Sequence, residues 1–262
     1  MSRGRTRQVL VERFDGGERH GRDPDQVVVE EPLEVRLDGN LVATTMRTPG
    51  HDFELAAGLC FTDGLLAGAP VVLCRYCSEC GSGAATEFNV VTVETGGAAP
   101  VPTARLGTTT SSCGLCGSTS IAELRDRLAP VTLAAPFPLD VLATLPEALG
   151  EQQLFAATGG VHCAAAVDHA GTALVAREDI GRHNAVDKVV GRLLLDGSLP
   201  APALALYVSG RASFEIVIKA WAAGFAAIAA VSAPSSLAVE AATTAGITLA
   251  GFVRGGRMNV YC

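Results

Sequence analysis

Aromatic side chains are scarce in this sequence: they make up 5% of the residues, and there is a single tryptophan. Nearly half of the residues (48%) are apolar all the same, so small and branched side chains must fill the interior. A chain of 262 residues with this composition can bury a sizeable core. We expect an α/β fold, arranged as one large domain or two small ones.

Long hydrophobic runs are also lacking, because no uncharged stretch reaches the roughly 18 residues that a membrane helix requires. The best candidate, Ala220–Val231, is too short and contains Gly224. Met1–Arg22 is rich in arginine and glycine and has no apolar segment of the kind found in secretion signals. We therefore expect a cytoplasmic protein without a membrane span. Residues 1–24 are predicted to form a disordered tail, with a docking arm as the functional alternative.

Positive charge is in deficit. The 20 lysines and arginines face 27 aspartates and glutamates, which gives a formal net charge of −7. This balance argues against a general nucleic-acid-binding protein. An anionic ligand would need a local concentration of basic residues.

Eight cysteines are present, at positions 60, 74, 77, 80, 113, 116, 163 and 262. Without a secretion signal we expect them to be reduced rather than bridged. Cys74, Cys77 and Cys80 repeat at every third residue, a spacing that could supply three ligands to zinc or an iron–sulfur cluster. No histidine or cysteine follows at ordinary zinc-finger distance. We therefore predict no structural metal in this chain.

Residues 108–117 read T-T-T-S-S-C-G-L-C-G and place Cys113 and Cys116 three apart between glycines. Ser120 and Glu123 have the spacing of a capping box, which predicts a helix that begins just after the two thiols. The N-terminus of a helix favours thiolate over thiol. A C-x-x-C pair is compatible with structural zinc, with thioredoxin-like redox chemistry and with sulfur carriage.

The apolar and polar pattern divides the rest of the chain. Two strands joined by an Asp38-Gly39 turn, a helix over 51–66 and a strand over 88–94 predict an α+β subdomain at residues 25–102. The C-x-x-C loop and its helix occupy residues 103–135. Residues 136–262 follow the order α-β-β-α-β-α-β-α-β. Such alternation predicts a largely parallel sheet with helices on both faces.

The order of helices and strands in residues 136–262 is similar to that of the cytidine deaminase-like fold, a three-layer α/β/α domain. Deaminase chemistry needs an H-x-E or C-x-E sequence at one helix start and P-C-x-x-C at the next. The corresponding turns here are 181–185 (G-R-H-N-A) and 209–213 (S-G-R-A-S). They contain no thiol, and no glutamate follows His183 at the required distance. The sequence therefore argues against a zinc-hydroxide deaminase.

Arginines stand at these turns instead. Arg182 and Arg211 lie at strand–helix junctions, and Arg254 and Arg257 follow the last expected strand. Ligands of open α/β sheets bind beyond the carboxyl ends of the strands. Arginine pairs with phosphate, and glycine lets the backbone approach it. The string F-V-R-G-G-R at Phe252–Arg257 thus predicts a binding site for phosphate or a nucleotide. The alternative is an ordinary glycine-rich turn whose arginines are solvated.

Six separate motifs in order, from about Val27 to Tyr261, make the chain resemble the formate dehydrogenase accessory sulfurtransferases, the FdhD-type sulfur carriers. The motifs are T-x-x-x-C-G-L-C-G around Cys113, T-G-G-V-H at Thr158–His162, R-E-D-I-G-R-H-N-A-V-D-K at Arg177–Lys188, S-G-R-A-S-F-E at Ser209–Glu215, S-A-P-S-S-L-A-V-E at Ser232–Glu240 and G-F-V-R-G-G-R-M-N-V-Y at Gly251–Tyr261. Cys80 and Cys163 depart from the family pattern, which leaves an extra metal or redox role open.

The resemblance implies a function. Members of this family are homodimers that accept sulfur from a cysteine desulfurase as a persulfide. They pass it to the bis(molybdopterin guanine dinucleotide) molybdenum cofactor needed by formate dehydrogenase. By resemblance, Cys113 carries the persulfide and Cys116 assists. The cofactor-binding prediction comprises Phe252, Val253, Arg254, Gly255, Gly256 and Arg257, together with Arg182, Arg211 and His183.

Three points stay open at this level. GDP or a related guanine nucleotide is expected to fit the cofactor site. His183 and Asn184 either contact the base or phosphate or cap the helix. Two alternatives of other classes are a thiol–disulfide oxidoreductase and a zinc-stabilised binding module.

Overall fold

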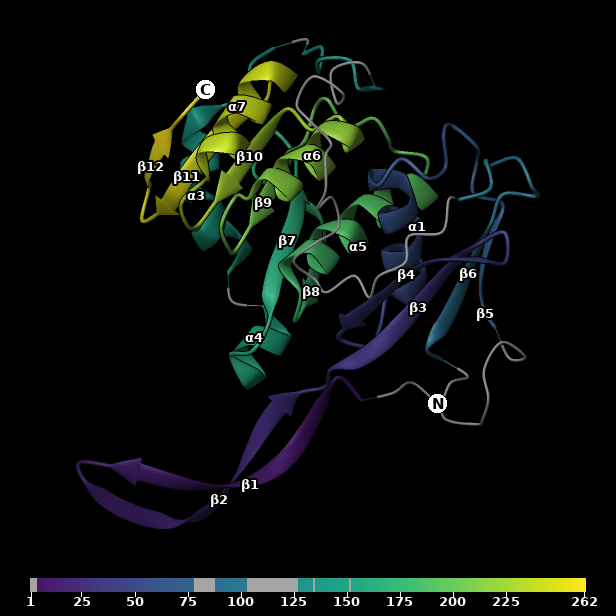
Figure 1. Cartoon of the computed structure of the whole chain (residues 1–262). Coiled ribbons are helices and arrows are strands. Elements are labelled where there is room, and N and C mark those ends of the chain that lie inside the picture. Colours follow the sequence, from purple (N-terminus) through teal and green to yellow (C-terminus); the bar gives the residue numbers. More distant parts are fainter. Residues whose placement is uncertain (1–3, 78–87, 103–126, 134, 151) are drawn as a thin grey trace.

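The computed structural model describes residues 4–77, 88–102, 127–133, 135–150 and 152–262. Two sheets with their helices form the body, and a two-stranded ribbon extends away from it (Figure 1). The larger, six-stranded sheet belongs to the C-terminal half of the chain. The smaller, four-stranded sheet belongs to the N-terminal half.

The large sheet has the strand order β12-β11-β10-β9-β7-β8. Its strands are β7 (His162–Val167), β8 (Ala173–Asp179), β9 (Ala205–Val208), β10 (Ala227–Ala230), β11 (Thr248–Arg254) and β12 (Arg257–Val260). Only two neighbouring pairs, β9–β10 and β10–β11, are parallel, whereas β7 is antiparallel to both of its neighbours and β12 is antiparallel to β11. The prediction of a largely parallel sheet was therefore wrong. The β7–β8 hairpin and the Gly255-Gly256 turn reverse the chain at both ends of the sheet.

Helices cover both faces of this sheet, as the alternation of buried residues requires. Leu206 and Ile228 pack on one face with α5, α6 and α7, whereas Tyr207 and Ala229 pack on the other face with α3. The bounds are α3 (Leu139–Leu149), α5 (Arg182–Leu195), α6 (Phe214–Ala223) and α7 (Ser236–Ala245). Figure 1 shows α5, α6 and α7 in front of the sheet and α3 behind it. The result is three layers.

The small sheet has the order β4-β3-β6-β5 and packs against α1. The elements are β3 (Glu31–Leu37), β4 (Asn40–Arg47), α1 (Asp52–Thr62), β5 (Leu73–Tyr76) and β6 (Val90–Glu94). Leu33, Val35 and Leu37 alternate inward along β3 and are fully buried. Three of these strands and α1 agree with the sequence pattern, but β5 was not predicted.

The first residues differ from the expected disordered tail. Thr6–Asp15 (β1) and Glu18–Val28 (β2) form an antiparallel ribbon whose pairs run from Thr6–Val28 to Asp15–Glu18. Gly16 and Gly17 have positive φ angles of 59° and 91° and supply the tight turn at the tip. The sequence pattern did not reveal the ribbon because both of its faces are largely exposed, so neither shows the one-sided apolar pattern of a packed strand. A further helix, α4 (Gln153–Thr158), was also missed.

Two glycines let α1 and α5 touch backbone to backbone, which joins the two halves. A Cβ atom on Gly191 would overlap the carbonyl oxygen of Glu54, and one on Gly58 would overlap that of Asp187. Because these obstacles are backbone atoms, a side chain at either position forces the helices apart. Positions 58 and 191 must therefore be glycine for the two helices to approach this closely.

We predict that Gly191→Ala lowers the free energy of unfolding by about 1–3 kcal/mol, the usual cost of overpacking. Helix propensity alone would give the opposite sign, a gain of about 1 kcal/mol. Urea unfolding of the variant and wild type measures the difference. Gly21→Ala is the matched control, since nothing lies within 4 Å of its added Cβ. A Gly191→Ala protein as stable as wild type would contradict the close approach.

An ion pair supports the same junction. Arg177 Nη2 on β8 donates to Glu54 Oε1 on α1 at 2.8 Å, and His51 Nδ1 lies 3.4 Å from Glu54 Oε2. Burial opposes ionisation of Glu54, but the hydrogen bonds from Arg177 and His51 outweigh it and hold its pKa at about 2. The carboxylate is thus stabilised in the folded state relative to the unfolded chain.

A pH dependence follows from this lowered pKa. The folded pKa lies below the ordinary value of 4.5, so the contribution of Glu54 to stability is complete above that value. It is lost as the pH falls from about 4.5 towards 2. We expect the difference in unfolding free energy between wild type and Glu54→Gln to shrink across this window in urea titrations. A difference that stays constant down to about pH 2 would show that Glu54 is not selectively stabilised as the anion.

Candidate functional site

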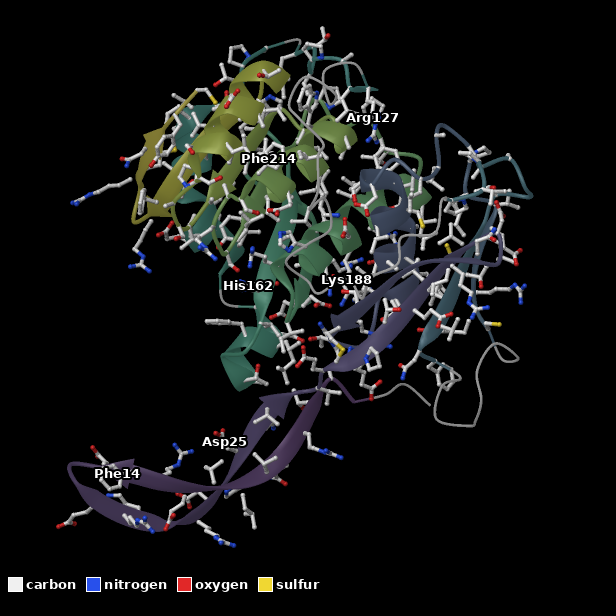
Figure 2. All side chains as sticks on the ribbon, viewed as in Figure 1. Phe14, Asp25, Arg127, His162, Lys188 and Phe214 are labelled. Carbon is white, nitrogen blue, oxygen red and sulfur yellow. The ribbon has the colours of Figure 1, made fainter. Side chains whose placement is uncertain are left out.

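A cavity of about 800 Å³ opens at the edge of the large sheet where β9, β10 and β11 end. Because β7 runs in the opposite direction, its first residue, His162, lies at this same edge, as Figure 2 shows. Nucleotides and other ligands of open α/β sheets bind beyond the carboxyl ends of strands. The walls include Phe155, His162, Tyr207, Ser209, Val253 and Arg254.

His162 and Arg182 flank Gly210 at this edge. A Cβ atom on Gly210 would lie 3.4 Å from ring atoms of His162 and 3.9 Å from Cδ of Arg182. Burial and the charge of Arg182 lower the pKa of His162, which favours the neutral form of the ring. Arg182 Nε is buried and has no hydrogen-bond partner among the residues that the structure describes. An unsatisfied buried donor of this kind calls for a hydrogen-bond acceptor.

The end of β11 supplies a second cation. Val253 and Arg254 both line the cavity, together with Glu147 of α3. The backbone N–H of Gly255 donates to Glu147 Oε1 at 2.7 Å, which holds the glycine turn against α3. Phe252 adopts a positive φ of 55° and is half exposed. The edge therefore combines the arginines of two separate sequence motifs.

Of the predicted residues, only Val253 and Arg254 line the cavity, whereas Arg182 lies beside Gly210, which follows the lining residue Ser209. Arg211 and Arg257 are exposed, and Arg257 pairs with Arg254 across the β11–β12 turn. His183 is buried, with Nε2 3.5 Å from Ser213 Oγ and 3.8 Å from Glu215 Oε2. This geometry joins α5 to the start of α6. The roles of these three residues in cofactor binding stay predictions.

Several residues at the cavity did not emerge from the sequence pattern. His162 was noted only as the end of the T-G-G-V-H motif, and Phe155, Tyr207 and Glu147 carried no signal. These residues are far apart in the sequence and meet only in the fold, because α4, β7, β9 and α3 bring them to one edge of the sheet. The sequence reveals the arginines because they follow strands directly.

Glu178 fixes the helix that carries Phe155. Its carboxylate accepts hydrogen bonds from the backbone N–H groups of Leu154, at 3.1 Å, and Phe155, at 2.7 Å. These donors belong to the first turn of α4, where helices leave N–H groups unpaired. Glu178 therefore acts as an N-terminal cap supplied by β8, and it positions one wall of the cavity.

Asp179 likewise accepts hydrogen bonds, and it stabilises the loop that precedes Arg182. Its Oδ1 accepts from the N–H of Gly181 at 2.8 Å and from Asn184 Nδ2 at 3.0 Å. Its Oδ2 lies 2.6 Å from Lys188 Nζ, and both side chains are fully buried. Figure 2 shows Lys188 inside the body, between the two halves. Within the R-E-D-I-G-R motif, the hydrogen bonds and the ion pair of Asp179 thus fix the loop that orients Arg182.

We predict that Glu178→Ala frees the start of α4. Hydrogen bonds to a charged group are worth about 1.5–3 kcal/mol, so local opening should become about tenfold more frequent or more. Hydrogen exchange at the amides of Leu154 and Phe155 measures this opening. Glu178→Gln keeps an acceptor and should show a smaller increase. Unchanged exchange in Glu178→Ala would mean that α4 is held by other contacts.

The predicted sulfur-carrying residues, Cys113 and Cys116, lie outside the described residues, as does Cys80. Cys163 lines the cavity, where burial raises its pKa to about 12. Burial also raises the pKa of Cys74 to about 11 and that of Cys60 above its ordinary range. A thiol must ionise to act as a nucleophile, so these three are poor candidates for sulfur chemistry.

Neither of two further features is found within the described ranges. No group of three or more histidine, cysteine or acidic side chains there could hold a metal ion. No helix of that part of the chain is long and apolar enough to cross a membrane. Cys77 is disulfide-bonded, so the expectation of reduced cysteines was wrong for that residue. Since Cys80 is not described, the prediction about a metal at Cys74, Cys77 and Cys80 stays a prediction.

Comparison with known proteins decides the family. Residues 28–262 match the family model described as the FdhD/NarQ family. The chain belongs to the FdhD/NarQ family. It is 48% identical over 250 residues to the sulfur carrier protein FdhD of Streptomyces avermitilis, an alignment that covers 91% of this chain and 87% of the relative. It is also 48% identical over 245 residues to that of Mycolicibacterium paratuberculosis, covering 91% and 90%.

A solved FdhD/NarQ-like structure supports the fold. The crystal structure of a formate dehydrogenase accessory protein from Desulfotalea psychrophila matches with a TM-score of 0.75 at 25% identity. The match covers 98% of this chain and 97% of that one. The mixed α/β arrangement described above is therefore that of an FdhD-type accessory protein.

Proposed function

We propose that this chain is a sulfur carrier that serves the maturation of formate dehydrogenase. The observation that carries the proposal is the 48% identity, across nine-tenths of the chain, to proteins named sulfur carrier protein FdhD. The sulfur donor is a cysteine desulfurase, and the acceptor is the bis(molybdopterin guanine dinucleotide) molybdenum cofactor. The resemblance also supports a cytoplasmic homodimer. These details extend beyond the family assignment.

The proposed chemistry begins at Cys113. Its thiolate attacks the terminal sulfur of the donor's persulfide, the donor's S–S bond breaks, and the donor leaves as a thiolate. Cys113 then holds the sulfur as a persulfide. If Cys116 attacks the inner sulfur, a Cys113–Cys116 disulfide forms and the terminal sulfur leaves as sulfide for the metal. If Cys116 only donates a hydrogen bond, it stabilises the persulfide until the terminal sulfur passes to the metal; an external thiol reductant then supplies the two electrons that make this sulfur sulfide, and Cys113 is left as a thiolate.

The proposed cofactor site is the cavity at the edge of the large sheet. Arg182 and Arg254 supply charge for the phosphates of the guanine dinucleotide, which the acidic chain otherwise disfavours. Neutral His162 can accept or donate a hydrogen bond there without adding charge. GDP or a related guanine nucleotide should occupy the same cavity. The molybdenum cofactor is the substrate in this scheme.

A finer statement about the fold belongs to the same proposal. The order β8-β7-β9-β10-β11, with β7 antiparallel to β9, supports the cytidine deaminase-like fold that we propose for residues 136–262. The turns at 181–185 and 209–213, which would carry the zinc site in a deaminase, hold Arg182 and Gly210 here. In our proposal an anion-binding edge replaces that metal site.

The test uses a bacterial host whose own FdhD-type gene is deleted. Expression of this chain should restore formate dehydrogenase activity, because sulfur reaches the cofactor again. The level of formate dehydrogenase protein, followed by immunoblot, must stay constant for activity to report on sulfur. Full-length, folded chain that restores no activity, in a host where a relative named FdhD does so, would refute the proposal.

A further inference from the structure

One residue of the N-terminal half directs its backbone and side-chain polar groups at the loop that leads to the cavity. Thr48 directly follows β4 and is fully buried. Its N–H donates to Asp179 Oδ2 at 3.2 Å, and its carbonyl oxygen accepts from Lys188 Nζ at 3.0 Å. Its hydroxyl oxygen accepts from the N–H of Ile180 at 3.1 Å. A single threonine of one half is thus bonded three times to one segment of the other half.

The local sequence explains how Thr48 can make these bonds. The next residue is Pro49, and a residue that precedes proline is restricted to an extended backbone. In an extended residue the N–H and the carbonyl group point to the same side, as they do in a hydrogen-bonded pair of an antiparallel ladder. Both groups can therefore reach the same segment, and the hydroxyl adds a third contact.

The loop that Thr48 contacts leads to two residues of the candidate site. Ile180 lines the cavity, and Arg182 follows two residues later as the first residue of α5. Arg182 Nε is buried and makes no hydrogen bond within the part of the chain that the structure describes. Because no bond of Nε fixes the side chain, the position of Arg182 depends on the backbone that precedes it.

We propose that Thr48 is a positioning residue for the nucleotide-binding cavity: its hydroxyl sets the backbone at Ile180 and thereby places Arg182 against the phosphates of the ligand. The N-terminal half thus contributes to a site whose described lining residues all lie at 146–254, in the C-terminal half. The inference rests on the proposed function, because it takes a guanine nucleotide as the ligand of the cavity.

The hydroxyl can be removed without changing much else. Valine has nearly the shape of threonine but accepts no hydrogen bond. In Thr48→Val the N–H of Ile180 loses its acceptor, and a buried donor without a partner is unfavourable. The backbone at Ile180 should therefore shift towards another acceptor. The bonds that the Thr48 backbone makes to Asp179 and Lys188 do not involve the side chain, so the buried ion pair stays in place.

Calorimetry with GDP on the full-length chain tests the inference. Thr48→Val should weaken GDP binding about tenfold, the effect of about one hydrogen bond. Thr48→Ser keeps the hydroxyl and should restore the wild-type affinity. Thr62→Val is the matched control, because the Thr62 hydroxyl is also buried between the two halves and donates to Asp187 Oδ1 at 2.8 Å. Thr62 is not among the described residues that line the cavity, so this variant should be less stable but bind GDP as wild type does.

A double-mutant cycle separates positioning from a general structural effect. If the hydroxyl acts through Arg182, Thr48→Val should have almost no further effect on GDP binding in a chain that already carries Arg182→Ala. An equal loss in both backgrounds would show that Thr48 does not act through Arg182 and would overturn the inference.

Failure of the inference differs from failure of the proposed function. Wild type that binds GDP, together with Thr48→Val that binds it as tightly, would overturn the inference alone. Wild type that binds no GDP would remove the ligand from the cavity, and the inference would fall with that part of the proposed function.

Discussion

Formate dehydrogenase activity should disappear when Cys113→Ala replaces the wild-type chain in the deletion host, while the fold stays intact. Alanine offers no thiolate, so no persulfide can form and no sulfur reaches the cofactor. The expected loss is at least about a thousandfold, since the carrier step is removed rather than slowed. Circular dichroism and thermal unfolding confirm that the variant is folded.

Cys163→Ala is the matched control for this experiment. Cys163 lies in the cavity wall, and burial raises its pKa to about 12, so it is not a thiolate at neutral pH. Its replacement should leave sulfur transfer close to wild type. Activity retained by Cys113→Ala, or lost equally in both variants, would contradict the assignment of the carrier thiol.

The second large effect concerns the ligand. Each charge-assisted contact with phosphate is worth roughly 1.5–3 kcal/mol, or about one to two decades of affinity. The double variant Arg182→Ala with Arg254→Ala should therefore weaken GDP binding by about two to four decades in calorimetry. Binding to wild type should also weaken as salt rises. Persulfide loading of Cys113 should be unchanged.

Two single variants sharpen this test. Arg192→Ala removes an exposed arginine that lies near the other end of α5 and pairs with Asp196, so GDP affinity should not change. The sequence pattern places Arg257 in the site and predicts a loss of about one to two decades for Arg257→Ala. In the structure Arg257 is exposed beyond the turn. GDP affinity that survives the double replacement would remove this edge from the site.

The sequence predicts those elements that bury an apolar stripe and end at a clear signal. In residues 136–262 the expected order α-β-β-α-β-α-β-α-β is found as α3-β7-β8-α5-β9-α6-β10-α7-β11, apart from the short α4 and the final β12. The direction in which a strand runs within its sheet leaves no such pattern in the sequence. The element order is the same whether β7 runs with or against β9, so only tertiary pairing decides it. The ribbon was missed because neither of its faces packs on the body, and its arginines and glycines have the composition of a disordered tail.

The residues of the candidate site also divide into those that the sequence reveals and those that it does not. Arg182 and Arg254 could be found because they directly follow strands, where open sheets bind ligands. His162 and Phe155 could not, since they reach the cavity from β7 and α4. The role of Glu178 is equally hidden: its carboxylate caps a helix that lies more than 20 residues earlier in the chain. Contacts of this kind depend on the assembled fold and leave no local pattern.

The most direct measurement of the central claim is intact mass after incubation with a cysteine desulfurase and cysteine. Wild type should gain about 32 Da for each sulfur it accepts, and dithiothreitol should remove the gain, as expected for a persulfide. Cys113→Ala should gain nothing under the same conditions, whereas Cys163→Ala should gain the same mass as wild type. A wild-type chain that gains no mass, or a Cys113→Ala chain that gains as much as wild type, would contradict sulfur carriage at Cys113.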